Sequence, residues 1–231
     1  MVRGRTISGS YVALGLAGCL LTSPAVAEDA APARPAIEMN RWQEDWSVLA
    51  NSALRTDVFD PIKYIPLSPW DPKSFISLGL TLRERFEHVD AQAFGTSGNK
   101  ADNYLLQRLQ FHVDVHFDEH WQMFVQLEDA RAFDKNVISP VDQNPLDLRL
   151  AFLAYVNATE AGTFKARVGR QDFAFDLQRF VSSRDGPNVR QSFDAAWADW
   201  ETGSWRFIGF VSQPVQYNNI QPFDDTSNSH F

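Results

Sequence analysis

Polar and apolar residues alternate most regularly along residues 105–128. Every second residue from Leu109 to Phe117 is apolar, and the residues between them are polar. After a polar stretch at 118–120 the alternation restarts at Trp121. Because side chains of a β-strand point to opposite faces with a period of two, the pattern predicts a β-hairpin with one apolar and one polar face. Each arm has about 10 residues, against a usual strand length of about 5–6.

The same alternation predicts seven strands. The strands are expected at residues 76–88, 105–117, 121–128, 146–156, 164–171, 193–200 and 205–213. Consecutive amphipathic strands joined by polar connections are typical of an all-β, antiparallel, up-and-down sheet or barrel.

The connections alternate between long and short, with long loops after the first, third, fifth and seventh strands. Transmembrane β-barrels show this asymmetry, with short periplasmic turns at one rim and long extracellular loops at the other. Aromatic residues also gather near strand ends, as in an interfacial girdle. These are Phe117, Trp121, Trp197, Trp200 and Trp205.

Periodicity alone does not separate a membrane barrel from a soluble up-and-down barrel, which would enclose its apolar face. Loop asymmetry, strand length and an N-terminal leader favour the membrane barrel. In that leader, Arg3 and Arg5 precede the apolar run 11–22, and residues 25–27 (Ala-Val-Ala) supply a cleavage site. The run is too short for a membrane-spanning helix.

We predict a signal peptide over residues 1–27, cleaved after Ala27. The alternative is lipoprotein processing, because residues 16–19 (Leu-Ala-Gly-Cys) resemble a lipobox that would place a lipidated Cys19 at the mature N-terminus. After cleavage at Ala27 the mature chain has no cysteine, and therefore no disulfide framework stabilises it.

Charge and composition restrict the kinds of molecule that the chain is expected to bind. The formal net charge of −8 becomes about −10 when Arg3 and Arg5 are removed, and an acidic chain argues against nucleic acid as a partner. The chain has 18 Phe and 7 Trp at a mean hydropathy of −0.30, a combination that suits amphipathic strands. After the leader, no apolar stretch approaches the ~20 residues of a helical membrane span.

Residues 28–75 are expected to form a periplasmic leader that precedes the barrel strands. Residues 40–54 carry apolar residues at roughly helical spacing, which predicts a short amphipathic helix that docks on another surface. Residues 62–71 form a Pro-rich link, and residues 76–231 form the N-terminal part of the barrel.

Several sequence blocks resemble the alginate export family of Gram-negative outer membranes. The blocks are Arg41-Trp42-Gln43-Glu44-Asp45-Trp46, Phe59-Asp60-Pro61-Ile62-Lys63-Tyr64-Ile65-Pro66-Leu67, Leu82-Arg83-Glu84-Arg85-Phe86-Glu87, Leu105-Leu106-Gln107-Arg108-Leu109, Val168-Gly169-Arg170-Gln171 and Gly186-Pro187-Asn188-Val189-Arg190-Gln191-Ser192-Phe193-Asp194. They span most of the mature chain and are specific in combination. The resemblance implies a monomeric barrel of about eighteen strands with an electropositive, arginine-lined pore for an anionic polyuronate.

Seven strands are fewer than the resemblance implies. Single-chain bacterial barrels close with an even number of strands, from about 8 upward, and an open sheet in lipid leaves unpaired backbone groups that cost several kcal/mol each. Phe231 lacks a preceding apolar strand, because Ser229, Ser227 and Asp225 occupy the matching alternate positions. We therefore expect an incomplete barrel, the N-terminal portion of a longer protein.

The polar strand face is predicted to line the lumen, and its basic residues to bind the substrate. Rings of arginine or lysine give pores an anion preference, and the planar guanidinium binds carboxylate bidentately. The alternative is that these residues pair with acids on neighbouring strands, such as Glu87, Asp114, Glu128 and Asp147. The predicted pore-lining residues are Arg83, Arg85, Arg108, Arg149, Lys165 and Arg167, with Arg170 near the outer rim; Arg206 joins them if the last strand keeps the alternation.

One strand face carries His112, Asp114 and His116, with successive side chains about 6.6 Å apart. Two of them could share a metal ion, but a third ligand is needed and the sequence nominates none. The favoured interpretation is polar filling of the lumen, and no metal or other cofactor is expected.

No feature of the sequence points to an enzyme. The acidic pairs Glu128-Asp129 and Asp224-Asp225 would point to opposite faces of a strand, which makes them poor acid–base pairs for glycoside hydrolysis. No nucleophile elbow, P-loop or His-Glu-x-x-His motif is present.

The sequence therefore predicts an outer-membrane channel for an anionic polysaccharide, such as an alginate-like polyuronate, or for related anions. The expected partners are this substrate, outer-membrane lipid, periplasmic chaperones and the barrel-assembly machinery. Two alternatives stay open at this point: a general anion-preferring porin for small organic acids, and a soluble periplasmic ligand-binding β-barrel.

Overall fold

The structure, a computed structural model, describes residues 34–90, 96, 101–173 and 182–227. All of them belong to one compact unit. The predicted signal peptide, the lipobox at Cys19 and the terminal Phe231 lie outside the described residues. None of the helices in the described part is long and apolar enough to cross a membrane.

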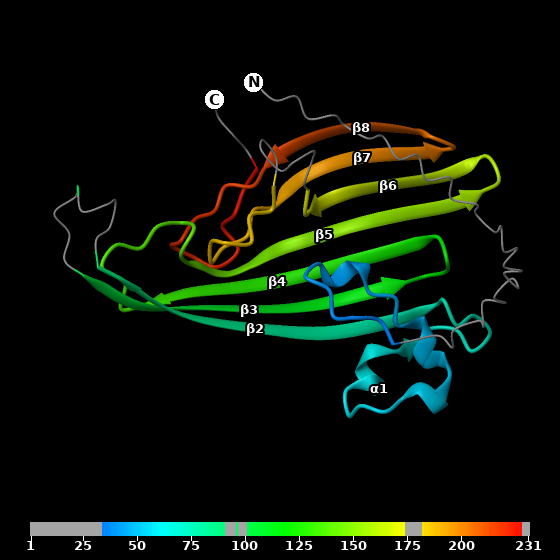
Figure 1. Cartoon of the computed structure of the whole chain (residues 1–231), viewed down its shortest axis with the longest axis horizontal. Coiled ribbons are helices and arrows are strands. Elements are labelled where there is room, and N and C mark those ends of the chain that lie inside the picture. The colour runs from blue at the N-terminus through cyan, green and yellow to red at the C-terminus, as the bar shows by residue number, and fades with distance from the viewer. Residues whose placement is uncertain (1–33, 91–95, 97–100, 174–181, 228–231) are drawn as a thin grey trace, which may run out of the picture. The chain divides into compact units, whose positions relative to one another are not determined.

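Eight strands form one antiparallel sheet in which each strand pairs with the next along the chain (Figure 1). Their bounds are β1 (Ile65–Pro66), β2 (Phe75–Val89), β3 (Asp102–His116), β4 (Trp121–Phe133), β5 (Asn144–Thr159), β6 (Gly162–Gln171), β7 (Phe193–Thr202) and β8 (Trp205–Pro214). The seven predicted strands are β2 to β8, and β1 adds a two-residue pairing on β2. The predicted all-β, up-and-down fold is confirmed. The sheet is not closed, because β1 and β8 are its edges.

Short and long connections lie at opposite ends of the sheet (Figure 1). The turns at residues 117–120, 160–161 and 203–204 lie at one end, here called the turn end. Residues 134–143 lie at the other end, here called the loop end, together with the ends of β2 and β3 that residues 90–101 join and the ends of β6 and β7 that residues 172–192 join. The predicted alternation of connection lengths is confirmed.

The apolar side chains of the strands are exposed on one face of the sheet. Leu80, Leu82 and Phe86 of β2 are 62%, 56% and 70% exposed, and Phe111 of β3 and Val168 of β6 continue the patch. Soluble monomers rarely expose contiguous apolar patches larger than a few hundred Å². A face of this kind matches the lipid-facing band of a transmembrane barrel.

The opposite, polar face is buried. Arg108, Gln110, His112 and Asp114 of β3 are all 6% exposed or less. Two parts of the chain lie on this face: residues 34–64, here called the N-terminal segment, and residues 182–192 of the β6–β7 connection, here called the inward loop. Because buried polar groups need partners, both parts must supply hydrogen bonds as well as apolar contacts.

The N-terminal segment does not form the single amphipathic helix predicted over residues 40–54. It forms three 3₁₀ helices, Arg41–Gln43, Trp46–Ala50 and Ser52–Leu54, and then the four-residue α1 (Asp60–Lys63). Asp45 and Asn51 interrupt it, because each has an extended backbone and its side chain accepts a hydrogen bond from the N–H two residues later.

Docking of this segment is nevertheless observed, at the turn end of the polar face. Trp46 and Leu49 pack with Phe75, the first residue of β2. Trp42 lies edge-on against Phe152 of β5, with ring centroids 6.0 Å apart. Of the apolar residues that suggested a helix, Trp46 and Leu49 are thus buried, and Trp42 and Leu54 are partly buried.

A β-bulge in β5 changes which side chains reach the polar face. Strict alternation places Leu148, Leu150 and Phe152 together on one face. The pairing of β5 with β4 slips by one residue at Arg149, which is left as the extra residue of the bulge. Leu150 and Phe152 consequently pack on the polar face with Phe124, and the predicted facing is wrong beyond the bulge.

Aromatic side chains form a row at the turn end of the apolar face. Trp121 contacts Tyr155 of β5 with ring centroids 4.7 Å apart, and Trp200 and Trp205 each stack on a phenylalanine of β8. Trp197 was predicted for the same row but lies on the polar face, where its indole nitrogen donates to a glutamine of β6 at 2.8 Å.

A buried carboxylate in α1 joins distant residues of the N-terminal segment to one another. Asp60 is 1% exposed and accepts two hydrogen bonds of 2.7 Å from Arg34, as well as the backbone N–H groups of Thr56 and Asp57. The bonds from Arg34, followed by those from the backbone, lower the pKa of Asp60 to about 2.

We expect Asp60→Asn to loosen this segment, because the neutral amide loses the charge-assisted bonds from Arg34. Trypsin cleavage after Arg55 at pH 7 should rise about tenfold, as measured by peptide mapping. Asp57→Asn is the matched control, because this exposed carboxylate accepts only the nearby N–H of Phe59. Equal cleavage of the two variants would contradict the assignment.

The same carboxylate predicts a pH dependence. A lowered folded-state pKa stabilises the protein above the unfolded pKa of about 4, and this stabilisation is lost as the pH falls towards the folded value. Hydrogen exchange of residues 34–60 should therefore accelerate, relative to the intrinsic rate, between pH 4 and pH 2. An Asp60→Asn variant should lack this transition.

Candidate functional site

Three of the predicted pore-lining arginines hold the inward loop. Arg83 donates to two backbone oxygens of residues 185–187 at 3.0 and 3.1 Å, and Arg85 donates to a third at 2.6 Å. Arg108 donates to the Asp185 carboxylate at 3.0 Å. The guanidinium donors of these three arginines are thus used in hydrogen bonds within the chain.

A buried amide fixes the same loop against the sheet. Asn188 is 1% exposed, and its Nδ2 lies 2.9–3.1 Å from the backbone oxygens of Gln107, Arg131 and Asp142. The N–H of Val189 also donates to the oxygen of Val141 at 3.0 Å. The inward loop is therefore bonded to β3, β4 and the β4–β5 connection.

Arg149, at the bulge of β5, belongs to a buried ion network. Its Nη2 contacts the Asp172 carboxylate at 2.5 Å, and its Nε lies 3.5 Å from the Glu128 carboxylate. Arg190 of the inward loop reaches Asp172 at 3.7 Å and donates to Asn40 of the N-terminal segment at 3.0 Å. The network therefore joins the N-terminal segment and the inward loop to the sheet. Its ion pairs agree with the alternative that the predicted arginines pair with acids on neighbouring strands.

Arg170 lies on the other face of the sheet. Its neighbour Gln171 points to the polar face, and Val168, of the same parity as Arg170, is exposed on the apolar face. Arg170 donates to the Asp194 carboxylate at 2.9 and 3.2 Å and to the oxygen of Leu148 at 3.1 Å. Arg170 was predicted to line the pore, but the alternation of side chains along β6 places it on the apolar face.

Lys165 and Arg167 remain, and both border a cavity of about 600 Å³ on the polar face. The cavity lies between the N-terminal segment and strands β4 to β8. Trp42 and Trp197 contribute aromatic faces to its wall, and Arg206 contributes a third cation.

Two of the three cations at the cavity have acidic partners. The Lys165 ammonium lies 3.3 Å from Glu201, and both side chains are part-exposed. Arg206 contacts Asp199 at 2.7 Å. The part-exposed pair of Lys165 and Glu201 is worth little energy and exchanges easily with an incoming ion, whereas Asp199 is 1% exposed and holds Arg206 more firmly.

Arg167 differs from the other six predicted residues, since within the described part of the chain no ion pair or hydrogen bond of its guanidinium is found. It is 9% exposed, and its carbon Cζ lies 3.8 Å from the ring centroid of Trp42 and 4.5 Å from that of Phe152. Its Nε is buried without a partner. Stacking leaves the in-plane N–H donors of a guanidinium unused, so Arg167 has donors available for an anion.

The histidine face is filled by protein contacts. His112 stacks on Phe124 with ring centroids 5.4 Å apart, and Gly79 makes room for it, since a Cβ there would lie 2.3 Å from His112 Cε1. Asp114 accepts hydrogen bonds from Gln122 at 2.9 Å and from His116 at 3.2 Å. These contacts agree with the interpretation of the face as polar filler.

Sequence reasoning missed two components of the cavity. Trp42 was assigned only to a docking helix, and Trp197 to the membrane girdle. Nothing in the sequence links Trp42 with Arg167, because the contact arises from docking of a distant segment. In β7, Trp197 has the same parity as Phe193 and Asp199, and the charged Asp199 indicates that this parity belongs to the polar face. The sequence therefore contained a signal for the position of Trp197.

The fold and the site together define a class of protein. An antiparallel up-and-down sheet with an exposed apolar face, an aromatic row at one end and a charged, cavity-lining opposite face is the wall of an outer-membrane β-barrel.

The family model for alginate export matches residues 74–231, and the chain belongs to this family of outer-membrane polysaccharide export channels. The family resemblance expected from the sequence is thereby confirmed. No curated protein and no solved structure matches the chain.

The buried network predicts strongly coupled mutations. Arg149→Met or Asp172→Leu alone leaves an opposite charge buried and should destabilise the folded protein by about 3–5 kcal/mol, whereas the double variant should cost much less than the sum. Urea unfolding in lipid vesicles measures the free energies. The control is Lys73→Met, which breaks an exposed pair with Asp45 and should cost less than about 1 kcal/mol. Additive effects at Arg149 and Asp172 would rule out the network.

Proposed function

We propose that the chain forms part of the wall of an outer-membrane channel for an anionic, uronate-type polysaccharide, with Arg167 as its principal binding residue. The observation that carries the proposal is the guanidinium of Arg167, which lies over the rings of Trp42 and Phe152 at the cavity and forms no ion pair with any described residue. Asp172 acts on it electrostatically but is not in contact with it. A buried cation without a contacting carboxylate favours an anionic ligand.

The cavity offers two kinds of contact to an acidic sugar. A carboxylate can accept two parallel N–H bonds from the guanidinium fork of Arg167. The indole ring of Trp197, which also lines the cavity, provides a flat apolar surface for the C–H face of a sugar ring. Together they favour a charged polysaccharide over a small organic acid, which would use only the first contact.

Passage requires binding that is weak enough to be reversed. Conducting pores meet this need with several sites of moderate strength. Lys165 and Arg206 are part-exposed and already paired with acids, so each attracts a carboxylate less strongly than Arg167. We infer a short series of sites in which Arg167 binds the carboxylate of the substrate most strongly, and Lys165 and Arg206 bind it more weakly and so allow its release.

The loop-anchoring arginines act differently in this proposal. Arg83, Arg85 and Arg108 hold the inward loop against the polar face, and so they set the space left for the substrate. Their positive charge still contributes to the potential of the lumen. The predicted pore lining thus divides into anchoring and binding residues.

The remaining expectations fit the same proposal. A signal peptide cleaved after Ala27 would export the chain across the inner membrane, and periplasmic chaperones and the barrel-assembly machinery would deliver it to outer-membrane lipid. The exposed apolar face of the sheet disfavours the soluble ligand-binding barrel, which would have to enclose that face. A general anion porin would be blocked by a small organic acid as well as by an oligouronate, which distinguishes it from a polysaccharide channel.

Planar-bilayer recordings of the protein purified from outer membranes test the binding role. Oligouronates should block the ion current, and a neutral oligosaccharide of equal length should not. For Arg167→Gln we expect the half-blocking oligouronate concentration to rise about tenfold or more, because charge-assisted bidentate bonds are lost.

Arg131→Gln provides the matched control. Arg131 carries the same charge change but pairs with Asp129 on the apolar side of β4, away from the cavity. It should leave the block unchanged. Equal block of wild type and Arg167→Gln would remove Arg167 from the path, and equal block by succinate would favour the general porin.

A further inference from the structure

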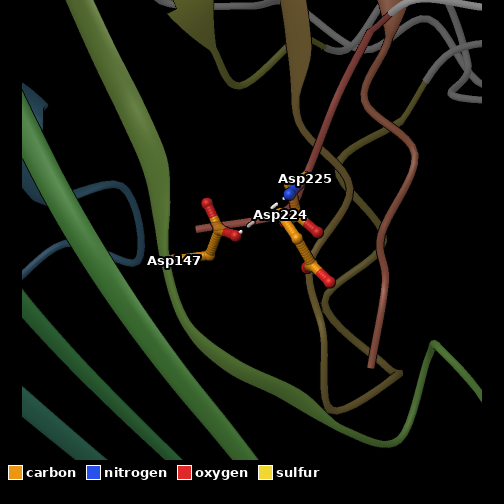
Figure 2. Close-up of side chains that lie close together, drawn as sticks. All are labelled: Asp147, Asp224 and Asp225. Carbon is orange, nitrogen blue, oxygen red and sulfur yellow. Dashed lines mark hydrogen bonds between the residues drawn. The ribbon is translucent and has the colours of Figure 1, made fainter. Parts of the chain in front are cut away.

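Three carboxylates meet where the loop of residues 215–227 returns to the loop end of β5. They belong to Asp147 in β5 and to Asp224 and Asp225 in the loop (Figure 2). One oxygen from each lies within 4.8 Å of the other two. Asp147 is 3% exposed and the other two are half-buried, so water screens their mutual repulsion only in part.

None of these three carboxylates forms an ion pair within the described part of the chain. Arg170 acts electrostatically on Asp147 and Asp225, but it donates its hydrogen bonds to Asp194 at 2.9 and 3.2 Å and so compensates the group only in part. The other contacts of the group are hydrogen bonds, such as that from the N–H of Asp225 to Asp147 at 3.2 Å. These do not neutralise three negative charges.

A second observation points to a ligand. Asn144 is 3% exposed and directs its carboxamide into the group, because its Nδ2 donates to Asp225 at 2.7 Å. The Oδ1 of the same carboxamide is buried and accepts no hydrogen bond, and neither does the buried Oδ1 of Asp224. Buried oxygens without donors are costly. Unused oxygens beside three carboxylates are the surroundings that a cation needs.

We propose that Asp147, Asp224 and Asp225, with the Oδ1 of Asn144, form a calcium site that fastens the 215–227 loop to β5. Carboxylate and amide oxygens are hard ligands that suit Ca²⁺ and Mg²⁺. At the Ca²⁺–oxygen distance of about 2.3–2.6 Å, opposite ligands lie about 4.6–5.2 Å apart, whereas Mg²⁺ at about 2.0–2.1 Å requires about 4.0–4.2 Å. Carboxylate oxygens up to 4.8 Å apart can therefore bind one Ca²⁺ ion, whereas Mg²⁺ would need them closer together.

The ion acts on a junction that is otherwise made by few bonds. The backbone N–H of Phe223 donates to the oxygen of Leu146 at 3.1 Å, next to the hydrogen bond from Asp225 to Asp147. Calcium adds bonds to both sides of this junction and removes the repulsion between them. With Ca²⁺ the loop is held at the loop end of the sheet, and without it the repulsion favours release.

Calcium binding is measured by calorimetric titration of the detergent-solubilised full chain. A dissociation constant of about 10⁻⁴–10⁻³ M is expected, the range of extracellular calcium modules. Asp224→Asn keeps an oxygen for the hydrogen bond from Gln221 but removes one charge, and should weaken binding about tenfold or more. The matched control is Asp134→Asn, because Asp134 is exposed at the same end and has a φ of 62°, which asparagine also adopts.

Proteolysis reports the position of the loop independently. Chymotrypsin cleavage after the exposed Phe223 should slow about tenfold in CaCl₂ for wild type and Asp134→Asn, and not for Asp224→Asn. NaCl of equal ionic strength should not protect. Absence of calcium binding, unchanged affinity in Asp224→Asn, or equal protection by NaCl or MgCl₂ would overturn the calcium site. Neither readout involves transport, so a failure here leaves the channel proposal untouched.

Discussion

The structure depends on one constraint: the sheet buries its polar face and exposes its apolar face. This inverts the arrangement of a soluble β-protein, in which the apolar face forms the core. Leu80, Leu82 and Phe86 have no protein to pack against, while Arg108 and His112 on the other face are almost fully covered. In the proposed channel, lipid covers the exposed face, and the chain itself supplies the partners that the polar face requires.

Covering a charged face with protein determines the role of each arginine. A buried guanidinium is tolerated when carboxylates or carbonyl oxygens surround it, as they surround Arg149 and Arg108. Those arginines are part of the architecture. Arg167 is covered by aromatic rings instead, which hold its plane but do not neutralise it. The proposal that Arg167 binds substrate while the other arginines anchor the chain therefore rests on the chemistry of the groups that cover each guanidinium.

The two covering parts of the chain are also linked to each other. Arg190 of the inward loop donates to Asn40 of the N-terminal segment and approaches Asp172 at the end of β6. Movement of either part therefore disturbs a buried charge network as well as its own contacts. The space left on the polar face, including the cavity at Arg167, is set by both parts together.

The alternation of polar and apolar residues by itself determined the strands, their antiparallel order and the alternation of turns and loops, because a period of two and short connections are local properties of the chain. The family followed from the resemblance of particular sequence blocks. The alternation failed where pairing between strands intervened: the bulge at Arg149 turned Leu150 and Phe152 to the polar face. It also placed the basic residues on a face without their partners. Which of them are paired, and that Trp42 lies on Arg167, only the tertiary structure decided, because those contacts join segments far apart in the sequence.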